Sequence, residues 1–518
     1  MKQISIFNHV LGPVMRGPSS SHTAGAFHIA TMVRSLLGGT PARVVCAFDP
    51  GGSYAHTYAQ QGADRAFAQG LMGRPLTDED FFLALTEAPA AGLDLRFEVR
   101  PIPAADHPNA VHIQAWPASG PGLELRASSI GGGDFEITGL DGWPVLFNGC
   151  GYELAVAVDR AGVAAVLDLI ERRGALLAPP TVQVRGAEAL VLATRGAAGS
   201  ELPGLLRGLP GVVRVLQADP VYFVQRGAPL FHSGAELVAQ AEAGGLSLGR
   251  LAILSEARLL GLAPEAVEAE ILRRYDVMAR AVRRGLEPDF QGMQLLPASA
   301  GAVLRAEGAG RLALGGPHLR AAARAMAVMH VNGAMGLVCA APTGGAAGTL
   351  PGAMVTLAEE RGLDRPAIAR ALMAAGAVGV VVALRATFAA EVAGCQVEIG
   401  AAGAMAAAAV VDAVGGGAAQ ACHAAAIAFQ NTMGLDCDPV QGVVEIPCHT
   451  RNAVAAANAF LCADLVLGGY GNPVPLDETL DAVYAVGRML PSELRCTAKG
   501  GLALAPSALA MNPCNGCR

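Results

Sequence analysis

Charged residues are scarce in this chain of 518 residues, and they form no dense basic run. Only 16% of the residues are charged, the formal net charge is −7, and the only lysines are Lys2 and Lys499. Proteins that bind nucleic acid or an anionic membrane surface usually carry clustered Lys and Arg. We therefore expect no nucleic acid and no membrane among the partners of this protein.

Apolar runs long enough to cross a bilayer are also lacking, although the mean hydropathy is +0.40. Residues 371–384 are apolar but too short, and residues 331–358 contain two prolines and many glycines. The first residues show no apolar region followed by a small-residue cleavage site, which a secretory signal would have. We therefore expect a cytoplasmic protein.

Small and apolar residues dominate the composition, with 52% hydrophobic residues and 65 glycines, which argues against disorder. The length suggests several domains. Apolar runs mixed with a helical period predict an α/β domain at residues 1–137. The order strand–helix–strand–strand–helix–strand predicts a ferredoxin-like α+β domain at residues 138–225. Helical periods predict a mostly α-helical domain at residues 226–518.

The chain has 11 cysteines, an odd number that favours reduced thiols and metal binding over a disulfide framework. Cys437 and Cys448 lie in GLDCDPVQGVVEIPCHTRN, and Cys395 lies upstream in GCQVEIG. Taken singly, a cysteine more often packs as a small buried hydrophobe, and this spacing is not CxxC. Thiolates are soft ligands for zinc or iron–sulfur clusters, and three protein ligands leave one position open for a substrate.

Two polar, glycine-bearing loops in the first domain have the composition of a ligand site. The loop GPSSSHT at residues 17–23 precedes a predicted helix, so its hydroxyls and free N–H groups can cap that helix or hold a carboxylate. The pattern alone favours capping. The loop ASSIGGGDF at residues 127–135 contains three successive glycines, which let a backbone approach a ligand closely.

Taken together, these motifs resemble the iron–sulfur-dependent L-serine dehydratases (L-serine ammonia-lyases), in a single-chain form with an ACT-like domain. The resemblance rests on the two cysteine motifs and on GPVMRGPSSSHTAGA, APTGGAAGTLPGAM and RCTAKGGLALAPSA, and it covers nearly the whole chain. It implies a small, beta-type substrate domain at residues 1–137. It also implies an ACT-like domain at residues 138–225 and the iron–sulfur catalytic domain at residues 226–518.

The resemblance implies a 4Fe–4S cluster held by Cys395, Cys437 and Cys448. Its open iron would act as a Lewis acid on the hydroxyl of L-serine, which is converted to pyruvate and ammonia. The cluster replaces pyridoxal phosphate, which we do not expect, because Lys499 is the only lysine away from the N-terminus that could form a Schiff base. Some relatives end in a cysteine that caps the open iron, a role that Cys514 or Cys517 could take.

The resemblance also suggests roles for polar residues around the cluster. His22 is the first candidate for the base that takes the α-proton, and Ser129 is the second. Arg451 can pair with the substrate carboxylate or simply anchor its loop. Where relatives often have a histidine this chain has Gln61, and the nearby His56 lies in another register. The expected substrate-binding residues are Ser19, Ser20, Ser21, Thr23, Thr343, Gly345, Ala346, Arg451 and Asn452.

Three other functions remain open at this point. The same scaffold could act on L-threonine or another β-hydroxy amino acid, because a pocket rejects one extra methyl group only weakly. The chain could be a non-catalytic amino-acid sensor, or a lyase with zinc on three thiolates. ACT-like domains usually pair, so we expect a homodimer.

Overall fold

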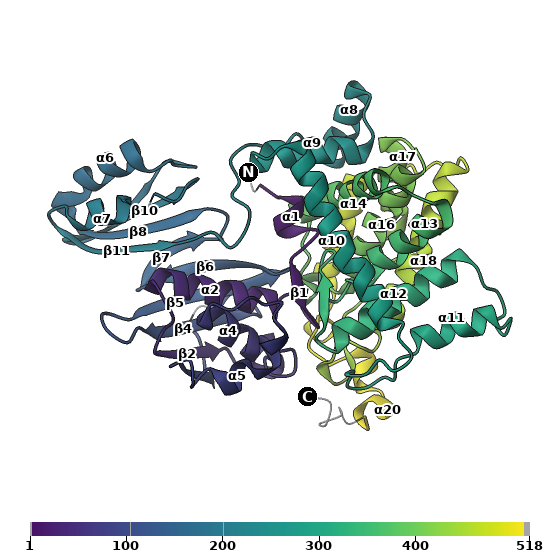
Figure 1. The fold of residues 1–518 in the computed structure, drawn as a ribbon, viewed down its shortest axis with the longest axis horizontal. Coiled ribbons are helices and arrows are strands. Elements are labelled where there is room, and N and C mark those ends of the chain that lie inside the picture. Colours follow the sequence, from purple (N-terminus) through teal and green to yellow (C-terminus); the bar gives the residue numbers. More distant parts are fainter. Residues whose placement is uncertain (1–2, 104, 200, 512–518) are drawn as a thin grey trace.

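The computed structural model describes residues 3–103, 105–199 and 201–511, so Cys514 and Cys517 lie outside the described residues. The chain forms a mixed α/β unit, a small four-stranded unit and a large helical unit (Figure 1). This confirms the mixed α/β first part and the helical last part that the sequence predicts.

A six-stranded sheet forms the centre of the α/β unit, with strand order β3-β2-β4-β5-β6-β7. All neighbouring strands are antiparallel except the parallel pair β2 and β3. Helix α2 packs its apolar residues on β5 and β6. The elements are α2 (Ala24–Leu37), β2 (Arg43–Phe48), α3 (Ser53–Thr57), α4 (Ala63–Met72), η1 (Glu79–Leu83), α5 (Ala84–Glu87), β3 (Asp94–Val99), β4 (Ala110–Trp116), β5 (Leu123–Gly131), β6 (Asp134–Leu140) and β7 (Trp143–Phe147).

This sheet corrects the expected boundary between the first two units. Strand β6 spans the expected boundary after residue 137, and β7 continues the sheet to Phe147. Strands β6 and β7 form a hairpin, and Leu140 pairs with Trp143 across its turn. The turn residues Asp141 and Gly142 both have positive φ, as tight hairpin turns require. The first unit therefore ends after Phe147.

The four-stranded unit has the sheet order β11-β8-β10-β9, and all its neighbouring strands are antiparallel. Together with the helix order, this is the βαββαβ topology expected from the sequence. Val166 and Ile170 of α6 are buried in a core that belongs to this unit alone. The elements are β8 (Tyr152–Asp159), η2 (Arg160–Gly162), α6 (Val163–Arg173), β9 (Thr181–Arg185), β10 (Glu188–Arg195), α7 (Leu202–Arg207) and β11 (Val212–Ala218).

The helical unit is built around α16, which packs against α14, α17 and α18. Its sequence IGAAGAMAAAAVVDA consists mainly of small residues, which allow the neighbouring helices to approach closely. The helices are α8 (Gly234–Gly244), α9 (Leu248–Leu260), α10 (Pro264–Gly285), α11 (Ala300–Gly308), α12 (Pro317–Gly333), α13 (Thr349–Arg361), α14 (Arg365–Arg385), α15 (Ala390–Ala393), η3 (Cys395–Val397), α16 (Ile399–Ala413), α17 (Ala418–Gln430), η4 (Val440–Gly442), α18 (Cys448–Leu467), α19 (Leu476–Met489), η5 (Ser492–Leu494), η6 (Gly501–Leu504) and α20 (Pro506–Leu509).

Two apolar helical segments, Arg365–Arg385 and Cys395–Ala413, are long enough to cross a membrane. Their most apolar windows are 78% and 94% buried inside the protein. Burial of this extent is typical of the core helices of a globular unit, and their hydrophobicity is explained by helix packing.

The first residues of the chain pack against the helical unit (Figure 1). Helix α1 (Ile6–His9) contacts α14, and strand β1 (Val14–Arg16) pairs antiparallel with β12 (Leu337–Cys339). The buried Glu256 of α9 accepts hydrogen bonds from Ser5 Oγ at 2.5 Å, Ile6 N at 2.9 Å and Phe7 N at 3.0 Å. One continuous apolar core therefore joins the α/β unit to the helical unit.

Candidate active site and metal centre

The three cysteines singled out from the sequence come together in the helical unit. Cys395 begins η3, Cys437 lies in the loop after α17, and Cys448 begins α18. All three are buried, and the thiols of Cys395 and Cys437 are hydrogen-bonded to each other. Burial raises the pKa of Cys448, and negative charge at Cys395 and Glu398 raises it further, so these groups lie within electrostatic range. The structure thus gathers residues that are up to 53 positions apart, from 395 to 448.

A carboxylate that the sequence analysis missed lies beside these thiols. Sγ of Cys395, Sγ of Cys437 and a carboxylate oxygen of Glu398 all lie within 4.8 Å of one another. Burial raises the pKa of Glu398 well above its usual range, and the charges of Cys395 and Glu391 act in the same direction. The only available signal was its place in the GCQVEIG motif, three residues after Cys395.

A fourth cysteine, Cys496, reaches the same group from the segment after α19. Cys437 N donates to Leu494 O at 2.8 Å, and Cys496 N donates to Cys437 O at 2.8 Å. The Cys496 thiol hydrogen-bonds the thiol of Cys437. The sequence analysis noted the RCTAKGG motif around Cys496 but gave this cysteine no role.

Arg451 is held by two aspartates near the cysteines. Its guanidinium donates to Asp436 Oδ1 at 2.8 Å, Asp438 Oδ1 at 3.0 Å and Asp436 O at 2.9 Å. These bonds favour the anchoring role for Arg451 over a bidentate clamp on a substrate carboxylate. The hydrogen bond with Cys437, together with the Arg451 charge, holds the pKa of Cys395 below its usual value.

Asn452 fastens the APTGGAAG loop to helix α18. Its Oδ1 accepts from Gly348 N at 3.1 Å and Thr349 N at 3.0 Å, and its Nδ2 donates to Gly345 O at 2.8 Å. The carboxamide of Asn452 therefore supports the loop that contains the predicted substrate-binding residues Thr343, Gly345 and Ala346.

The APTGGAAG loop itself faces the thiols and Glu398. The Thr343 hydroxyl accepts from Ala346 N at 3.2 Å and hydrogen-bonds Glu398. A Cβ on Gly345 would be in ordinary contact, at 3.5 Å, with both carboxylate oxygens of Glu398, so Gly345 lies directly beside this carboxylate. Ala346 packs in one apolar cluster with Cys395 and Cys437.

His22 lies in the turn before α2 and is held by hydroxyl groups on both ring nitrogens. Its Nε2 is 2.7 Å from Thr57 Oγ1, and its Nδ1 is 3.1 Å from Ser19 Oγ and 3.2 Å from Ser21 Oγ. Burial lowers the pKa of His22 to about 4, although the charge of Glu391 acts in the opposite direction. The imidazole is therefore neutral near pH 7.

The other hydroxyl residues of the SSSHT loop have different partners. Ser20 Oγ accepts from Gly344 N at 3.2 Å, which ties this loop to APTGGAAG. Ser21 Oγ donates to Glu391 Oε1 at 3.1 Å. Thr23 Oγ1 donates to the carbonyl oxygen of Arg16 at 2.7 Å, a bond that stabilises the turn. Helix α2 has no side-chain cap from Thr23, so the simple capping hypothesis is wrong for this residue.

Ser129 lies behind His22, with Tyr54 between them. Ser129 is fully buried, and its Oγ donates to Asp134 O at 3.4 Å. The Tyr54 hydroxyl hydrogen-bonds Ser129 and donates to Ser21 O at 2.8 Å, while its ring lies edge-on to His22. Gln61 Nε2 donates to Gly442 O at 3.0 Å, which links the α/β unit to the loop between Cys437 and Cys448.

A cavity of about 200 Å³ lies between the α/β and helical units beside these groups. Thr57 and Glu391, which contact His22 and Ser21, lie on its wall together with Cys496 and Lys499. Next to it, Asn109 Nδ2 donates to Glu391 Oε1 at 3.3 Å, and the buried Asn109 Oδ1 has no partner among the described residues. The cavity is lined by Gly51, Gly52, Ser53, His56, Thr57, Pro108, Glu391, Ser492, Arg495, Cys496, Thr497 and Lys499.

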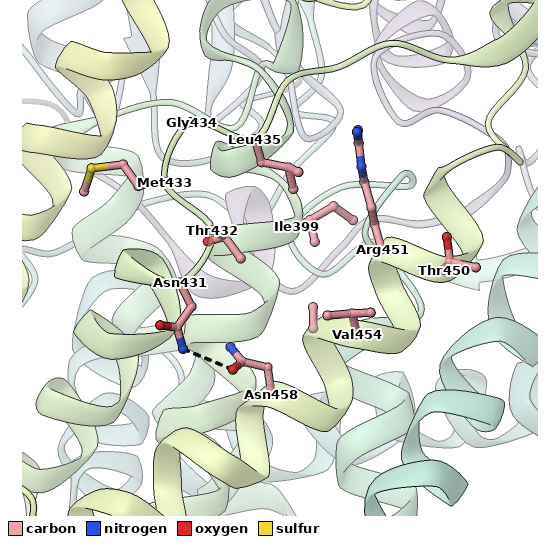
Figure 2. A pocket seen from close by; sticks show the side chains of 11 residues that line it. Ile399, Asn431, Thr432, Met433, Gly434, Leu435, Thr450, Arg451, Val454 and Asn458 are labelled. Carbon is pink, nitrogen blue, oxygen red and sulfur yellow. Dashed lines mark hydrogen bonds between the residues drawn. The ribbon is translucent and has the colours of Figure 1, made fainter. Parts of the chain in front are cut away.

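Arg451 lines a second, larger cavity of about 480 Å³ (Figure 2). Figure 2 shows Asn431 and Asn458 joined by a hydrogen bond, 3.1 Å long, beside the apolar side chains of Ile399 and Val454. No cysteine or titratable side chain other than Arg451 lines it. Of the two cavities, the smaller is the better candidate for a reaction site, because its wall includes Glu391, Cys496 and the Thr57 hydroxyl that hydrogen-bonds His22.

The residues around Cys437 fit a metal centre. Buried thiols become thiolates when a soft metal replaces their protons, and Arg451 adds positive charge beside them. Within the described residues, the group of Cys395, Glu398 and Cys437 is the one set of metal-ligating side chains with mutually close ligand atoms. The arrangement can hold a metal centre near a cavity whose wall residue Thr57 hydrogen-bonds the neutral imidazole of His22.

Comparison with known proteins agrees with this site. Residues 183–503 match the family model described as "Serine dehydratase alpha chain". The chain is 37% identical over 278 residues to "Probable L-serine dehydratase, alpha chain" of Bacillus subtilis, which covers 54% of this chain and 93% of that protein. It is 46% identical over 193 residues to the protein of the same name from Latilactobacillus sakei, covering 37% and 92%.

A third relative is "L-serine dehydratase TdcG" of Escherichia coli, 34% identical over 285 residues, with 53% of this chain and 62% of that protein covered. The family match extends over more than half of the chain and includes all four clustered cysteines. On these grounds the chain belongs to the serine dehydratase alpha chain family.

Proposed function

We propose that this protein is an L-serine ammonia-lyase, which converts L-serine to pyruvate and ammonia. The observation that carries the proposal is one cavity between two units whose wall includes Thr57, which hydrogen-bonds the neutral His22, and Cys496, whose thiol hydrogen-bonds Cys437 of the cysteine group. Relatives that carry the name L-serine dehydratase support it.

The cofactor in this proposal is a 4Fe–4S cluster on Cys395, Cys437 and Cys448. When bound, the cluster supplies a Lewis acid that polarises the substrate hydroxyl and makes it a better leaving group. Thiolate ligands also suit zinc, so metal analysis has to distinguish the two. Glu398 adds a carboxylate at the edge of this group, where its raised pKa lets it hold a proton.

His22 is the residue that takes the α-proton in this proposal. Its pKa of about 4 keeps it deprotonated at neutral pH, and the hydroxyls of Ser19 and Ser21 fix its orientation through Nδ1. Nε2 points to Thr57, a residue of the cavity wall. Ser129 is the weaker candidate, because Tyr54 lies between it and His22.

The charged groups around the cavity suit a small zwitterion. Glu391 and the unpartnered Asn109 Oδ1 are acceptors for the substrate ammonium group. Lys499 on the cavity wall is a donor for the carboxylate. The small cavity fits serine, and L-threonine remains the second substrate to test.

The remaining parts of the proposal concern domain roles and assembly. The βαββαβ unit is an ACT-like module, since its strand order agrees with that topology. Two such modules pair, and we therefore propose a homodimer. The α/β unit carries the substrate-binding loop, and the helical unit carries the cluster. The burial of both long apolar helices agrees with a cytoplasmic enzyme.

The test is an anaerobic pyruvate assay with L-serine and L-threonine on reconstituted wild type and Cys437→Ser, with iron, sulfide and zinc determined. We expect about four irons in the wild type and loss of both iron and activity in the variant. Cys462→Ser, a buried cysteine in α18 outside the site, is the matched control and should behave like the wild type. Full activity without iron would refute the proposal.

A further inference from the structure

We propose that a cavity of about 470 Å³, separate from the candidate active site, binds a small carboxylate that has no ammonium group, such as a 2-oxo acid. The cavity lies where the start of the chain, helix α2, the segment after β11 and helix α10 meet. It shares no lining residue with the 200 Å³ cavity. The inference goes beyond the proposed function and does not depend on it.

Two guanidinium groups on the cavity wall attract an anion. Arg273 and Arg274 both lie on α10, and among the described residues no carboxylate belongs to the lining. Behind the wall, Glu270 accepts from Arg273 Nε at 2.7 Å, from Arg273 Nη2 at 2.8 Å and from Arg274 Nε at 2.7 Å. One carboxylate beside two guanidinium groups leaves one net positive charge at this wall.

The two guanidinium groups also keep donors for a ligand. Arg274 is 5% exposed, and its Nη1 donates to Phe7 O at 2.6 Å and to Leu11 O. Nη1 of Arg273 and Nη2 of Arg274 have no hydrogen-bond partner among the described residues. A carboxylate in the cavity can accept charge-assisted hydrogen bonds from these nitrogens.

The polar groups at the other end of the cavity are neutral and bonded to each other. The Tyr222 hydroxyl donates to Gly133 O at 2.8 Å, and His28 Nδ1 lies 2.9 Å from the same oxygen. Burial lowers the pKa of His28 to about 4, so its imidazole is uncharged near pH 7. Burial raises the pKa of Tyr222 well above its usual value, and the charge of Asp134, which is not part of the lining, acts in the same direction. The charge that a ligand meets on the wall therefore comes from α10.

The acceptors near the guanidinium groups are already used by the protein. Asn8 Nδ2 donates to Phe223 O at 2.9 Å, and Asn8 Oδ1 accepts from Phe223 N at 3.0 Å. The carbonyl oxygen of Phe7 accepts from Arg274. An ammonium group here would lose its hydration without gaining an acceptor, and it would be repelled by the guanidinium groups. This disfavours amino acids, L-serine included, and favours a carboxylate without an ammonium group.

Aromatic and aliphatic side chains on the remaining wall suit an apolar body on the ligand. The rings of Phe7 and Phe223 have centroids 5.8 Å apart, and Val14 and Val221 lie on the same wall. The volume of about 470 Å³ exceeds the 200 Å³ of the candidate active site, so a branched carbon skeleton fits. A 2-oxo acid with a branched apolar chain combines these features, and we use 4-methyl-2-oxopentanoate as the probe.

The first test compares two ligands that share one carbon skeleton. Isothermal titration calorimetry on the anaerobic wild-type holoenzyme should show saturable binding of 4-methyl-2-oxopentanoate at one site per chain. L-leucine, which has an ammonium group in place of the oxo group, should bind at least about tenfold more weakly. Equal affinity for the two ligands, or no saturable binding of the 2-oxo acid, would overturn the proposal.

The second test locates the site with three variants. Arg273→Ala should raise the Kd of the 2-oxo acid at least about tenfold, because a charge-assisted hydrogen bond is lost. Arg283→Ala removes an exposed arginine of α10 outside the lining, and Lys499→Ala removes the lysine of the 200 Å³ cavity. Both should keep the wild-type Kd. Weaker binding in Lys499→Ala with an unchanged Kd in Arg273→Ala would place the ligand in the candidate active site and refute the inference.

The proposed function and this inference fail independently. A wild type that binds the 2-oxo acid through Arg273 but does not convert serine overturns the proposed function and leaves this inference standing. A wild type that converts serine but does not bind the 2-oxo acid overturns this inference alone.

Discussion

The four-stranded unit and the rest of the molecule differ in how their cores are built. Strands β8 to β11 and their helices enclose a core of their own, centred on residues such as Val156, Val166 and Ile170. The α/β and helical units share one continuous core, into which the first residues of the chain are packed, and one face of the four-stranded sheet adds Ala155, Leu190, Leu216 and Ala218 to it. The candidate site lies between the α/β and helical units. Changes in the shared core should disturb catalysis or global stability, and changes in the separate core of the four-stranded unit should disturb neither the cavity nor the thiols.

The largest expected effect is on the reaction itself. Replacing His22 with Gln removes the proposed base while preserving hydrogen-bonding groups toward Ser19, Ser21 and Thr57. We expect kcat to fall by about 10²–10⁴-fold, the usual contribution of a general base. Iron content and the cluster spectrum should not change. An unchanged kcat would show that another group takes the proton, and Ser129→Ala would then be the next variant to assay.

A second variant removes the contact between the first residues of the chain and helix α9. Glu256→Ala removes the acceptor for Ser5 Oγ, Ile6 N and Phe7 N, which are all buried. Because these donors are then left without partners, the free energy of unfolding should fall by about 3–5 kcal/mol, as measured by urea unfolding. The matched control is Glu268→Ala, which removes a partly exposed ion pair with Arg250 and should cost less than about 1 kcal/mol. If the two variants lost the same free energy of unfolding, the buried hydrogen bonds of Glu256 would stabilise the protein no more than an exposed ion pair does.

A third variant tests whether the four-stranded unit is independent. Ile170→Ala opens a cavity in its separate core and should destabilise that unit by about 2–5 kcal/mol. The midpoint of its unfolding should shift, while kcat and the cluster spectrum stay at wild-type values. Leu372→Ala makes the matching cavity in the shared core. If Ile170→Ala lowered kcat as much as Leu372→Ala did, the core of the four-stranded unit would not be independent of the active site.

The smallest expected effect is on pH dependence. Burial lowers the pKa of His22 from 6.5 to about 4, so between these values the unfolded chain binds more protons than the folded one. Stability should therefore fall as the pH falls through this window, by about 2 kcal/mol between pH 7 and pH 5 from this residue. His22→Gln should lose that part of the pH dependence in urea titrations at the two pH values. An identical slope in wild type and variant would show that His22 is not buried in its neutral form.

Local patterns in the sequence were enough to predict the helical unit and the order of elements in the four-stranded unit, and to single out Cys395, Cys437 and Cys448 as candidate ligands. Cys496 was missed, because its position beside Cys437 depends on backbone bonds across 59 residues, from 437 to 496. Glu398 and Asn109 were missed for a similar reason: their chemistry comes from neighbours that are distant in sequence, such as Glu391. The domain boundary was misplaced because the hairpin of β6 and β7 extends the first sheet past residue 137.

The pairing of β1 with β12 has a consequence for biosynthesis. Residues 14–16 leave the ribosome well before residues 337–339, which complete their two-stranded sheet. At about 5–20 residues per second, the early segment waits on the order of 15–60 seconds for its partner strand. Cys496 emerges later still. The group of thiols around Cys437 is therefore complete only after translation of almost the entire polypeptide.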